Sequence, residues 1–450
     1  MSSMIRLVAL AGAALLAAPA WGQAGSDSPS TPDAAPPTPP ERWAIHAQAT
    51  ITIQATPGFR SPYTGPNSLT PNQAKETFDT TLYFGFRPWR GLEVWVNPEV
   101  DQGFGLSNTL GVAGFPSAEA YKVGKRAPYV RLQRLFARQT IDLGGEASPV
   151  AAAANQLGGV STANRLVVTL GKFSVADVFD TNKYAHDPRA DFLNWAIVDT
   201  GTFDYAADAW GYSSGVAVEW YQGPWTLRAG LFNLSKVPNG EVLEPRFGQS
   251  QINGEVEHRH SIGGKAGAVR VTVFRNRGRF GKFEDALRLA SVTGSAPDTA
   301  LVRRSRTRIG VAVNAEQAVT DTVGVFLRAG GSDGAIEPYD FTDIDRTVSG
   351  GVSVNGKRWG RAADTVGLAA VVNDISAAHR RYLAAGGIGV LVGDGRLPRP
   401  GREAVGELYY DLKLAKPVDL TFDYQLVTNP GYNRDRGPAH VFGARLHGAF

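Results

Sequence analysis

Strict alternation of apolar and polar residues begins near Trp43 and recurs through the rest of the chain. In residues 45–56, isoleucine and alanine occupy every second position, and histidine, glutamine and threonine occupy the positions between them. A period of two places each set on a different face of a β-strand. The run is longer than the strands of about 5–6 residues that are usual in globular proteins. The pattern predicts a long strand with one apolar and one polar face.

Similar segments predict about sixteen strands. One of them changes phase, because Val130 and Leu132 alternate out of step with Leu135, which indicates a β-bulge or a miscounted position. The predicted strands cover residues 43–56, 77–87, 92–101, 128–141, 163–173, 210–222, 225–234, 250–260, 265–276, 305–316, 321–330, 344–354, 364–373, 403–415, 418–428 and 440–450.

The connections between these segments alternate between short and long. Residues 142–162 are the exception, a long insert rich in Ala and Gly where a short turn is due. Short turns at one rim and long loops at the other are typical of outer-membrane barrels. We therefore predict an all-β fold, a transmembrane up-and-down antiparallel β-barrel over residues 43–450, with both termini in the periplasm. Ser376 precedes helix formers, so residues 376–385 are expected to form a short helix within a long loop.

The N-terminal residues indicate secretion. Arg6 precedes an apolar run at Leu7–Ala18 and small residues suited to cleavage, so residues 1–23 are interpreted as a signal peptide. Residues 24–42 are rich in Pro and Ser and are interpreted as a linker or periplasmic tail. No other segment has the 18 apolar residues that suggest a transmembrane helix. Localisation in the bacterial outer membrane follows as the expectation.

Composition excludes several kinds of chemistry. The chain has no Cys, so disulfides, thiolate metal sites and Cys nucleophiles are absent. The formal net charge of +4 is too small to indicate electrostatic capture of nucleic acid. Residues 211–215 match the GxSxG pattern, but a nucleophile elbow needs a strand–turn–helix context, and here a strand follows. His258 and His260 share one strand face without an evident third ligand. We expect no catalytic residues, no metal and no cofactor.

The longest region without strand periodicity is residues 174–209, the third long loop in order. It is rich in Asp and aromatic residues, which can hydrogen-bond to sugar hydroxyls and pack on sugar rings. We expect it to fold inward and narrow the channel. The same polar side chains could instead bond to the backbone of the loop. The candidate substrate-binding residues of the loop are Asp177, Asp180, Asn182, His186, Asp187, Arg189, Asp191 and Trp195.

Strand phase assigns a second set of candidates to the inner face of the barrel. A mixture of guanidinium and carboxylate groups can exchange hydrating water for sugar hydroxyls. The same charges could simply pair with one another across the channel, as is common in porins. These channel-lining candidates are Trp95, Glu219, Arg228, Arg270, Arg308, Arg328 and Arg445.

Several stretches resemble the carbohydrate-selective outer-membrane porins of the OprB type. They are GKFSVADVFDTNKYAHDPRADFLNWAIVDTGTFDYAADAWGY at 171–212, ISAAHRRYLAAGG at 375–387, LTFDYQLVTNPGYNRDRGP at 420–438 and HVFGARLHGAF at 440–450. The resemblance extends from about Trp43 to the end of the barrel. It implies a sixteen-stranded barrel that passes monosaccharides, glucose foremost, by facilitated diffusion.

The expected partners are monosaccharides, outer-membrane lipid and lipopolysaccharide. The last strand, which ends in Phe450, resembles the signal read by the barrel assembly machinery. Monomer and oligomer both fit the pattern, because a lipid-facing strand and a subunit interface are equally apolar. The alternatives in function are a general or anion-preferring diffusion pore, given the lumen arginines, and an outer-membrane barrel hydrolase, given residues 211–215. A soluble lectin-like β protein is opposed by the sorting of the loops.

Overall fold

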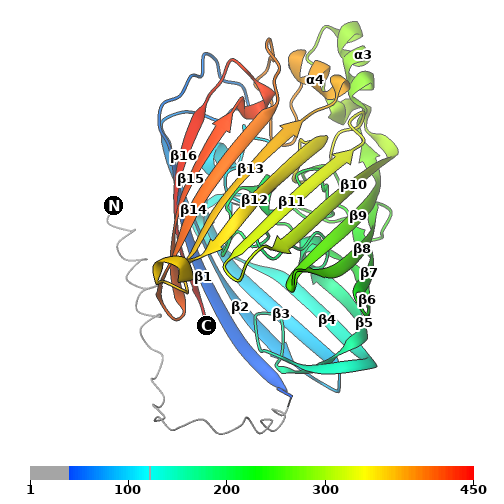
Figure 1. The fold of residues 1–450 in the computed structure, drawn as a ribbon. Helices are drawn as coiled ribbons and strands as arrows, with labels where there is room; N and C mark the ends of the chain where they lie inside the picture. The colour runs from blue at the N-terminus through cyan, green and yellow to red at the C-terminus, as the bar shows by residue number, and fades with distance from the viewer. Residues whose placement is uncertain (1–39, 121–122) are drawn as a thin grey trace, which may run out of the picture. The chain divides into compact units, whose positions relative to one another are not determined.

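The computed structural model describes residues 40–120 and 123–450. The signal peptide expected at 1–23 and all but the end of the Pro-rich segment 24–42 lie outside the described residues. Within the described part, the chain forms a closed barrel in which each strand pairs antiparallel with the next and β1 pairs with β16 (Figure 1). The predicted sixteen-stranded, up-and-down antiparallel barrel is confirmed.

All sixteen predicted segments are strands, with boundaries that differ by a few residues in most cases. The strands are β1 Trp43–Thr56, β2 Gln73–Phe86, β3 Leu92–Gly103, β4 Lys125–Val150, β5 Gly159–Phe173, β6 Ser213–Gln222, β7 Trp225–Asn233, β8 Ser250–Ile262, β9 Lys265–Phe280, β10 Arg304–Ala318, β11 Val323–Ser332, β12 Arg346–Asn355, β13 Thr365–Asp374, β14 Glu403–Ala415, β15 Val418–Thr428 and β16 Ala439–Ala449.

Exposure alternates along the strands as the sequence pattern predicts. In β9, Val269, Val271 and Val273 are 38%, 41% and 50% exposed, whereas Arg270 and Thr272 between them are buried. The exposed apolar face is the one suited to lipid, and closure of the sheet pairs every strand so that no edge is left unsatisfied in the membrane. No helix within residues 40–120 and 123–450 is both long enough and apolar enough to cross a membrane.

Residues 142–162 differ from the prediction of a long insert. The alternating pattern weakens there, yet β4 continues to Val150 and β5 begins at Gly159, so the connection itself is residues 151–158. The two strands pair through Ala147 with Thr162 and Val150 with Gly159, with register shifts near Gly144. Backbone pairing between β4 and β5 therefore continues past the last residues that show alternation of apolar and polar side chains.

The phase change predicted in β4 is a β-bulge. Asn97 of β3 faces Arg134, and the next residue, Pro98, faces Leu132, so Gln133 is the extra residue. A bulge reverses the side on which all later residues of the strand point. Leu132 and Leu135 are therefore both exposed on the lipid face, although they are an odd number of residues apart.

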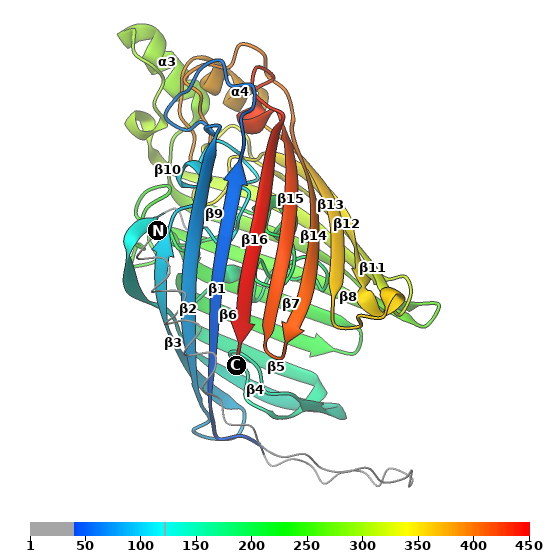
Figure 2. The same cartoon turned by 90° about the vertical axis from the view of Figure 1, so that its left-hand side faces the viewer.

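The long loops gather at one rim and carry the helices. Figure 2 shows α3 and α4 at the rim opposite the C-terminus. The predicted helix is α4, Ala377–Ala384, and the side chain of its N-cap Ser376 accepts a hydrogen bond from the His379 backbone N–H. In the part of the chain that the structure describes, the other α-helices are α2, Trp195–Val198, and α3, Phe283–Thr293, which the sequence pattern did not reveal.

Outer-membrane barrels carry girdles of aromatic residues at both membrane interfaces, and the aromatic residues near the strand ends follow that rule only in part. Trp43, Trp220 and Trp225 are 68%, 44% and 49% exposed on the outer surface. Trp210, the first residue of the predicted strand 210–222, is only 6% exposed, and the guanidinium carbon of Arg131 lies 3.3 Å from the centre of its ring. Residue 210 precedes β6, so it belongs to the third loop rather than to a strand.

Candidate channel site

The third loop, defined here as residues 174–212, connects β5 to β6 and is mostly buried. Its short helix α2 is buried at all four positions, and Asn194 caps it by accepting a hydrogen bond from the backbone N–H of Ala196. Phe192 of the loop packs edge-on against Tyr409 of β14, with ring centres 4.8 Å apart. The loop therefore contacts the face of the strands that is opposite to the exposed apolar face.

Asp180 and Asn182 hold the first half of the loop against β10 and β11. The Asp180 carboxylate accepts hydrogen bonds from the Thr200 backbone N–H at 2.6 Å and from Asn314 Nδ2 at 2.7 Å. Arg328 of β11 donates to the carbonyl of Asp180 at 3.1 Å, and its Nε lies 3.5 Å from Oδ1. Asn182 donates to Asn314 Oδ1 at 2.7 Å. The polar groups of Asp180 and Asn182 are therefore used to bind the loop to the barrel wall.

Arg445 and Asp191 hold the middle of the loop. Arg445 of β16 donates to the carbonyls of Pro188 and Asp191, at 2.5 and 2.9 Å. The Asp191 carboxylate accepts from the backbone N–H groups of His186 and Asp187, at 3.1 and 3.2 Å. Burial, reinforced by the nearby charge of Asp187, raises the pKa of Asp191 to about 6. Both candidates thus fix the path of the backbone.

The last part of the loop is held by Arg308. This side chain of β10 is fully buried and lies 3.2 Å from Asp204 of the loop and 3.3 Å from Asp345, which precedes β12. Asp204 also accepts backbone N–H bonds from Tyr339 and Asp340 of another long loop. The structure therefore places Arg308, Arg328 and Arg445 in contacts that hold loops to the wall, each with no exposed surface.

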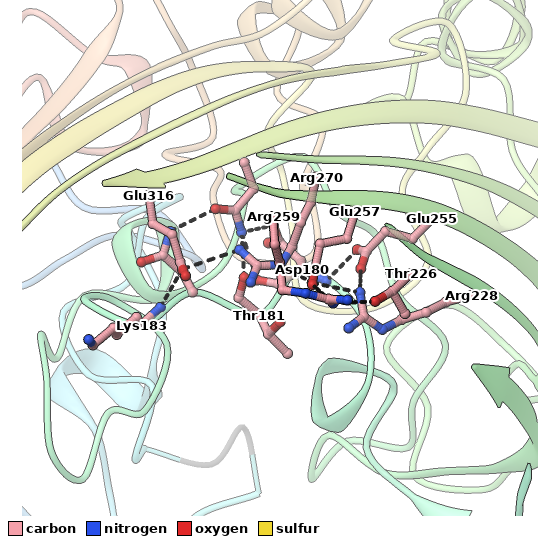
Figure 3. A network of polar contacts seen from close by, with 12 residues as sticks. Asp180, Thr181, Lys183, Thr226, Arg228, Glu255, Glu257, Arg259, Arg270 and Glu316 are labelled. Carbon is pink, nitrogen blue, oxygen red and sulfur yellow. Dashed lines mark hydrogen bonds and ion pairs between the residues drawn. The ribbon is translucent and has the colours of Figure 1, made fainter. Parts of the chain in front are cut away.

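Arg228 and Arg270 belong to a cross-strand ladder of charges on the wall (Figure 3). Arg228 of β7 lies 3.0 Å from Glu219, 2.6 Å from Glu255 and 3.0 Å from Glu257. Arg270 of β9 continues the ladder to Glu257 at 2.9 Å and to Glu316 of β10 at 3.2 Å. The third loop joins it, because Glu255 accepts the Asp180 N–H and Glu316 accepts the Lys183 N–H.

A cavity of about 510 Å³ lies beside the third loop and is completed by β2, β4 and β5. Five of the predicted loop residues line it. The arginines of the ladder and the three wall arginines that hold the loop, Arg308, Arg328 and Arg445, do not. Aromatic side chains also line it, namely Tyr83, Phe136, Phe173, Trp195, Tyr205, Trp210 and Tyr212. The charged or ionisable lining residues are Glu119, Arg134, Arg138, Asp177, His186, Asp187, Arg189 and Asp199.

Arg134 and Asp177 form a bidentate ion pair at this cavity. The guanidinium donates to the two carboxylate oxygens at 2.6 and 2.8 Å, and it lies 4.9 Å from the ring centre of Tyr212. Burial alone would raise the pKa of Asp177, but the charge and hydrogen bonds of Arg134 bring it below its ordinary value. The pair stays ionised and presents donors and acceptors of fixed geometry.

Arg189 lies among three carboxylates. Its guanidinium lies 2.8 Å from Asp79, 3.1 Å from Glu119 and 3.6 Å from Glu99. Burial opposes the charge of Arg189, but the carboxylates around it more than compensate and raise its pKa well above the ordinary value. Arg189 therefore both fixes the loop to β2 and β3 and contributes a permanent positive charge to the cavity.

Asp199 is a group of the cavity whose protonation changes near neutral pH, and His186 lies beside it. Burial and the neighbouring Asp180 raise the pKa of Asp199 to about 7. Burial, together with the charge of Arg328, lowers the pKa of His186. The two side chains lie 3.9 Å apart, from Nδ1 to Oδ1. Asp199 can therefore serve as a neutral donor or as a charged acceptor.

Sequence reasoning missed several lining residues, including Arg134 and Arg138. Both face inward only because the β-bulge at Gln133 reverses the phase of β4. The signal that could have found them is the alternation of Leu135 and Ala137 with Arg134, Phe136 and Arg138, read separately from the first half of the strand. Among the candidates, Trp95 is fully buried and donates to Glu93 at 3.1 Å, so it does not line the cavity.

The weaker motifs have structural roles. Ser213, in the GxSxG match, begins β6, is fully buried and donates to the carbonyl of Asn233 at 2.6 Å. The strand–turn–helix context of a nucleophile elbow is absent there. The rings of His258 and His260 stack with centres 6.0 Å apart. Within the described residues, no three His, Asp or Glu side chains are grouped as a metal site would require.

Comparison with known families identifies the chain. The model of the carbohydrate-selective porin, OprB family, matches residues 67–450. The chain belongs to this family. Membership and fold together indicate a sugar porin integral to the outer membrane, a channel rather than an enzyme. No curated protein matches the sequence.

Solved structures share the fold of this porin. The high-pH structure of Pseudomonas putida OprB has a TM-score of 0.69 at 16% sequence identity, over 91% of this chain and 94% of that chain. The low-pH structure of the same protein has a TM-score of 0.50 at 12% identity, over 91% and 93%. At these identities the likeness concerns the barrel, not the residues that contact a solute.

Proposed function

We propose that this porin lets monosaccharides of the glucose type diffuse passively into the periplasm, and that the third loop forms the narrow, selective part of the channel. The observation that carries the proposal is the cavity between the loop and the wall. Its volume of about 510 Å³ lies within the range of about 300–1,000 Å³ that is usual for small-molecule sites.

The charges around the cavity suit a neutral polar solute. Three arginines and four acidic residues line it, so neither sign dominates. Guanidinium groups donate to sugar hydroxyls and carboxylates accept from them, which replaces the hydrogen bonds of the displaced water. Trp210 and Tyr212 add flat apolar surfaces. A general pore with anion preference would be better served by an excess of unpaired cations.

The ion pairs also keep binding weak enough for flux. Arg134 and Arg189 already bond to carboxylates, so a sugar exchanges with partly satisfied groups and does not rescue unpaired charges. Conduction requires binding that is favourable enough for the solute to enter and weak enough for it to leave. The paired charges of this cavity fit that requirement.

Single-channel recording in planar bilayers tests the proposal. We expect glucose to reduce the ion current reversibly and in a concentration-dependent manner, and the current to show no strong anion preference. Asp187→Asn and Arg138→Gln, which alter cavity-lining residues, are expected to weaken the glucose effect. Arg358→Gln, in the short turn after β12, is the matched control and is expected to leave it unchanged. An anion-selective current that glucose does not affect would refute the proposal in favour of a general pore.

A further inference from the structure

The outer surface of β9 carries three arginines in a row near the rim with the long loops. Arg275, Arg277 and Arg279 occupy successive outward positions, and each is exposed. Phe274, Asn276 and Phe280, at the alternate positions, are buried on the inner face. We name Arg275, Arg277 and Arg279 the arginine column.

The column begins where the apolar outer face of the barrel ends. Below it on β9 the outward residues are Val269, Val271 and Val273, all exposed and apolar. Arg275 still lies between two apolar neighbours, because it pairs with Ile252 of β8 and Ile309 of β10. Arginine on the lipid face of a barrel is costly at the middle of the bilayer and tolerated near the interface. The column thus marks the level at which lipid tails give way to headgroups.

Hydroxyl groups flank the upper part of the column. Arg277 pairs with Ser250 of β8 and with Thr307 of β10, and Arg279 pairs with Ser305. Side chains of directly paired residues lie on the same face of a sheet, close enough to act together. At about 3.4 Å per residue, the three arginines span about 14 Å along the strand. Guanidinium and hydroxyl donors together form a surface that suits phosphate groups.

The arginines of the neighbouring strand, unlike those of the column, have acidic partners. Arg304 and Arg306, on the inner face of β10, both pair with Asp285, and Arg308 pairs with Asp204. Over residues 40–120 and 123–450, the three guanidinium groups of the column form no ion pair. Three exposed positive charges are thus left without an acidic partner among the described residues.

We propose that the arginine column binds the phosphate groups of lipopolysaccharide in the outer leaflet. The long loops of an outer-membrane barrel face the outside, so the column lies at the level of the outer-leaflet headgroups. Arginine recognises phosphate through paired N–H donors, and clusters of basic residues next to a membrane segment bind anionic lipid headgroups. The exposed valines below the column provide the surface for the acyl chains of the same molecule.

The test measures binding of fluorescent, bisphosphorylated lipid A to the detergent-solubilised porin, with dephosphorylated lipid A as the second probe. The perturbed protein is the triple variant Arg275→Gln, Arg277→Gln, Arg279→Gln. We expect it to bind bisphosphorylated lipid A at least tenfold more weakly, and binding by the original protein to fall as salt is added. The control, Arg90→Gln, removes a highly exposed arginine from a short turn at the other rim and is expected to change nothing.

Three results would overturn the proposal. In the first, the triple variant binds bisphosphorylated lipid A with an affinity within twofold of the original protein. In the second, the original protein binds dephosphorylated lipid A equally well. In the third, the triple variant changes its oligomeric state but still binds lipid A as the original protein does. The last would assign the column to a contact between subunits. Heat-modifiable migration in gels checks that each variant is folded. If the triple variant does not fold, Arg277→Gln alone is expected to weaken binding about threefold.

Discussion

The raised pKa of Asp199 predicts that glucose binding in the channel depends on pH. Its carboxyl lines the cavity, is 9% exposed and has a pKa raised to about 7 by burial and by Asp180. A group with this pKa is about 90% neutral at pH 6 and about 90% ionised at pH 8. Burial and the charge of Arg328 lower the pKa of the neighbouring His186, which favours its neutral imidazole.

The expected effect of raising the pH from 6 to 8 is tighter binding of glucose. A hydrogen bond to an ionised group contributes about 1.5–3 kcal/mol, against about 0.5–1.5 kcal/mol for a neutral pair. A difference of about 1 kcal/mol corresponds to about a fivefold change in the dissociation constant. The same ionisation adds a negative charge to the cavity, so the preference of the channel for cations over anions should rise with it.

The assay is glucose titration of single-channel current at pH 6 and pH 8. Asp199→Asn keeps the shape of the side chain and stays neutral, so we expect its glucose affinity to equal that of the original protein at pH 6 and not to change with pH. Asp321→Asn, in a short turn of the other rim, is the control and should keep the fivefold change. Glucose affinity that is equal at the two pH values, or a pH effect that persists in Asp199→Asn, would refute the reasoning.

The stability of the folded loop should depend on the same protonation of Asp199. It should fall as the pH rises, whereas glucose binding should strengthen. Folding raises the pKa of Asp199 above that of the unfolded chain, so the folded state binds the proton more tightly. The contribution to stability is complete below about pH 4 and is lost as the pH rises to about 7. Asp199→Asn removes this dependence, which the temperature of the heat-induced gel shift measures at several pH values.

Three further substitutions test the anchoring of the loop and the cavity. Arg328→Gln removes buried, charge-assisted hydrogen bonds worth about 1.5–3 kcal/mol each, so bilayer recordings should show a higher and noisier conductance. Gly324→Ala places a methyl group in the ring of Tyr184 and should lower stability by about 1–3 kcal/mol. Its control, Gly406→Ala, meets open space and should change stability by less than about 0.5 kcal/mol. Denaturation followed on gels measures both. Arg134→Gln breaks a bidentate pair at the cavity and should weaken glucose block about fivefold, unless the pair only holds the loop, in which case affinity is retained.

The barrel could be predicted because its information is local and repeated. Each strand carries its own alternation, and the sorting of short and long connections fixes the order of pairing without any long-range contact. The exceptions have local causes as well. Residues 142–162 extend a hairpin through backbone pairing, which side-chain patterns do not record, and one extra residue, Gln133, reverses the phase of a strand.

The site could be predicted only in part, because the path of the third loop depends on residues far from it in sequence. Arg328 reaches the loop from 148 positions beyond Asp180, and Arg445 from 254 positions beyond Asp191. No local pattern distinguishes an inward arginine that anchors a loop from one that faces open channel. Strand phase correctly placed Arg308, Arg328 and Arg445 on the inner face, but the partners of these residues required the structure.

The aspartates of the third loop divide into two groups with different roles. Asp180, Asp191 and Asp204 accept backbone N–H bonds or meet arginines of the wall, so they hold the loop in one conformation. Asp177, Asp187 and Asp199 belong to the cavity. The first role supports the second, since groups that are held in place lose little entropy when a sugar arrives. Under the proposed function, a rigid frame with weakly binding, already paired groups would let this loop select a solute without retaining it.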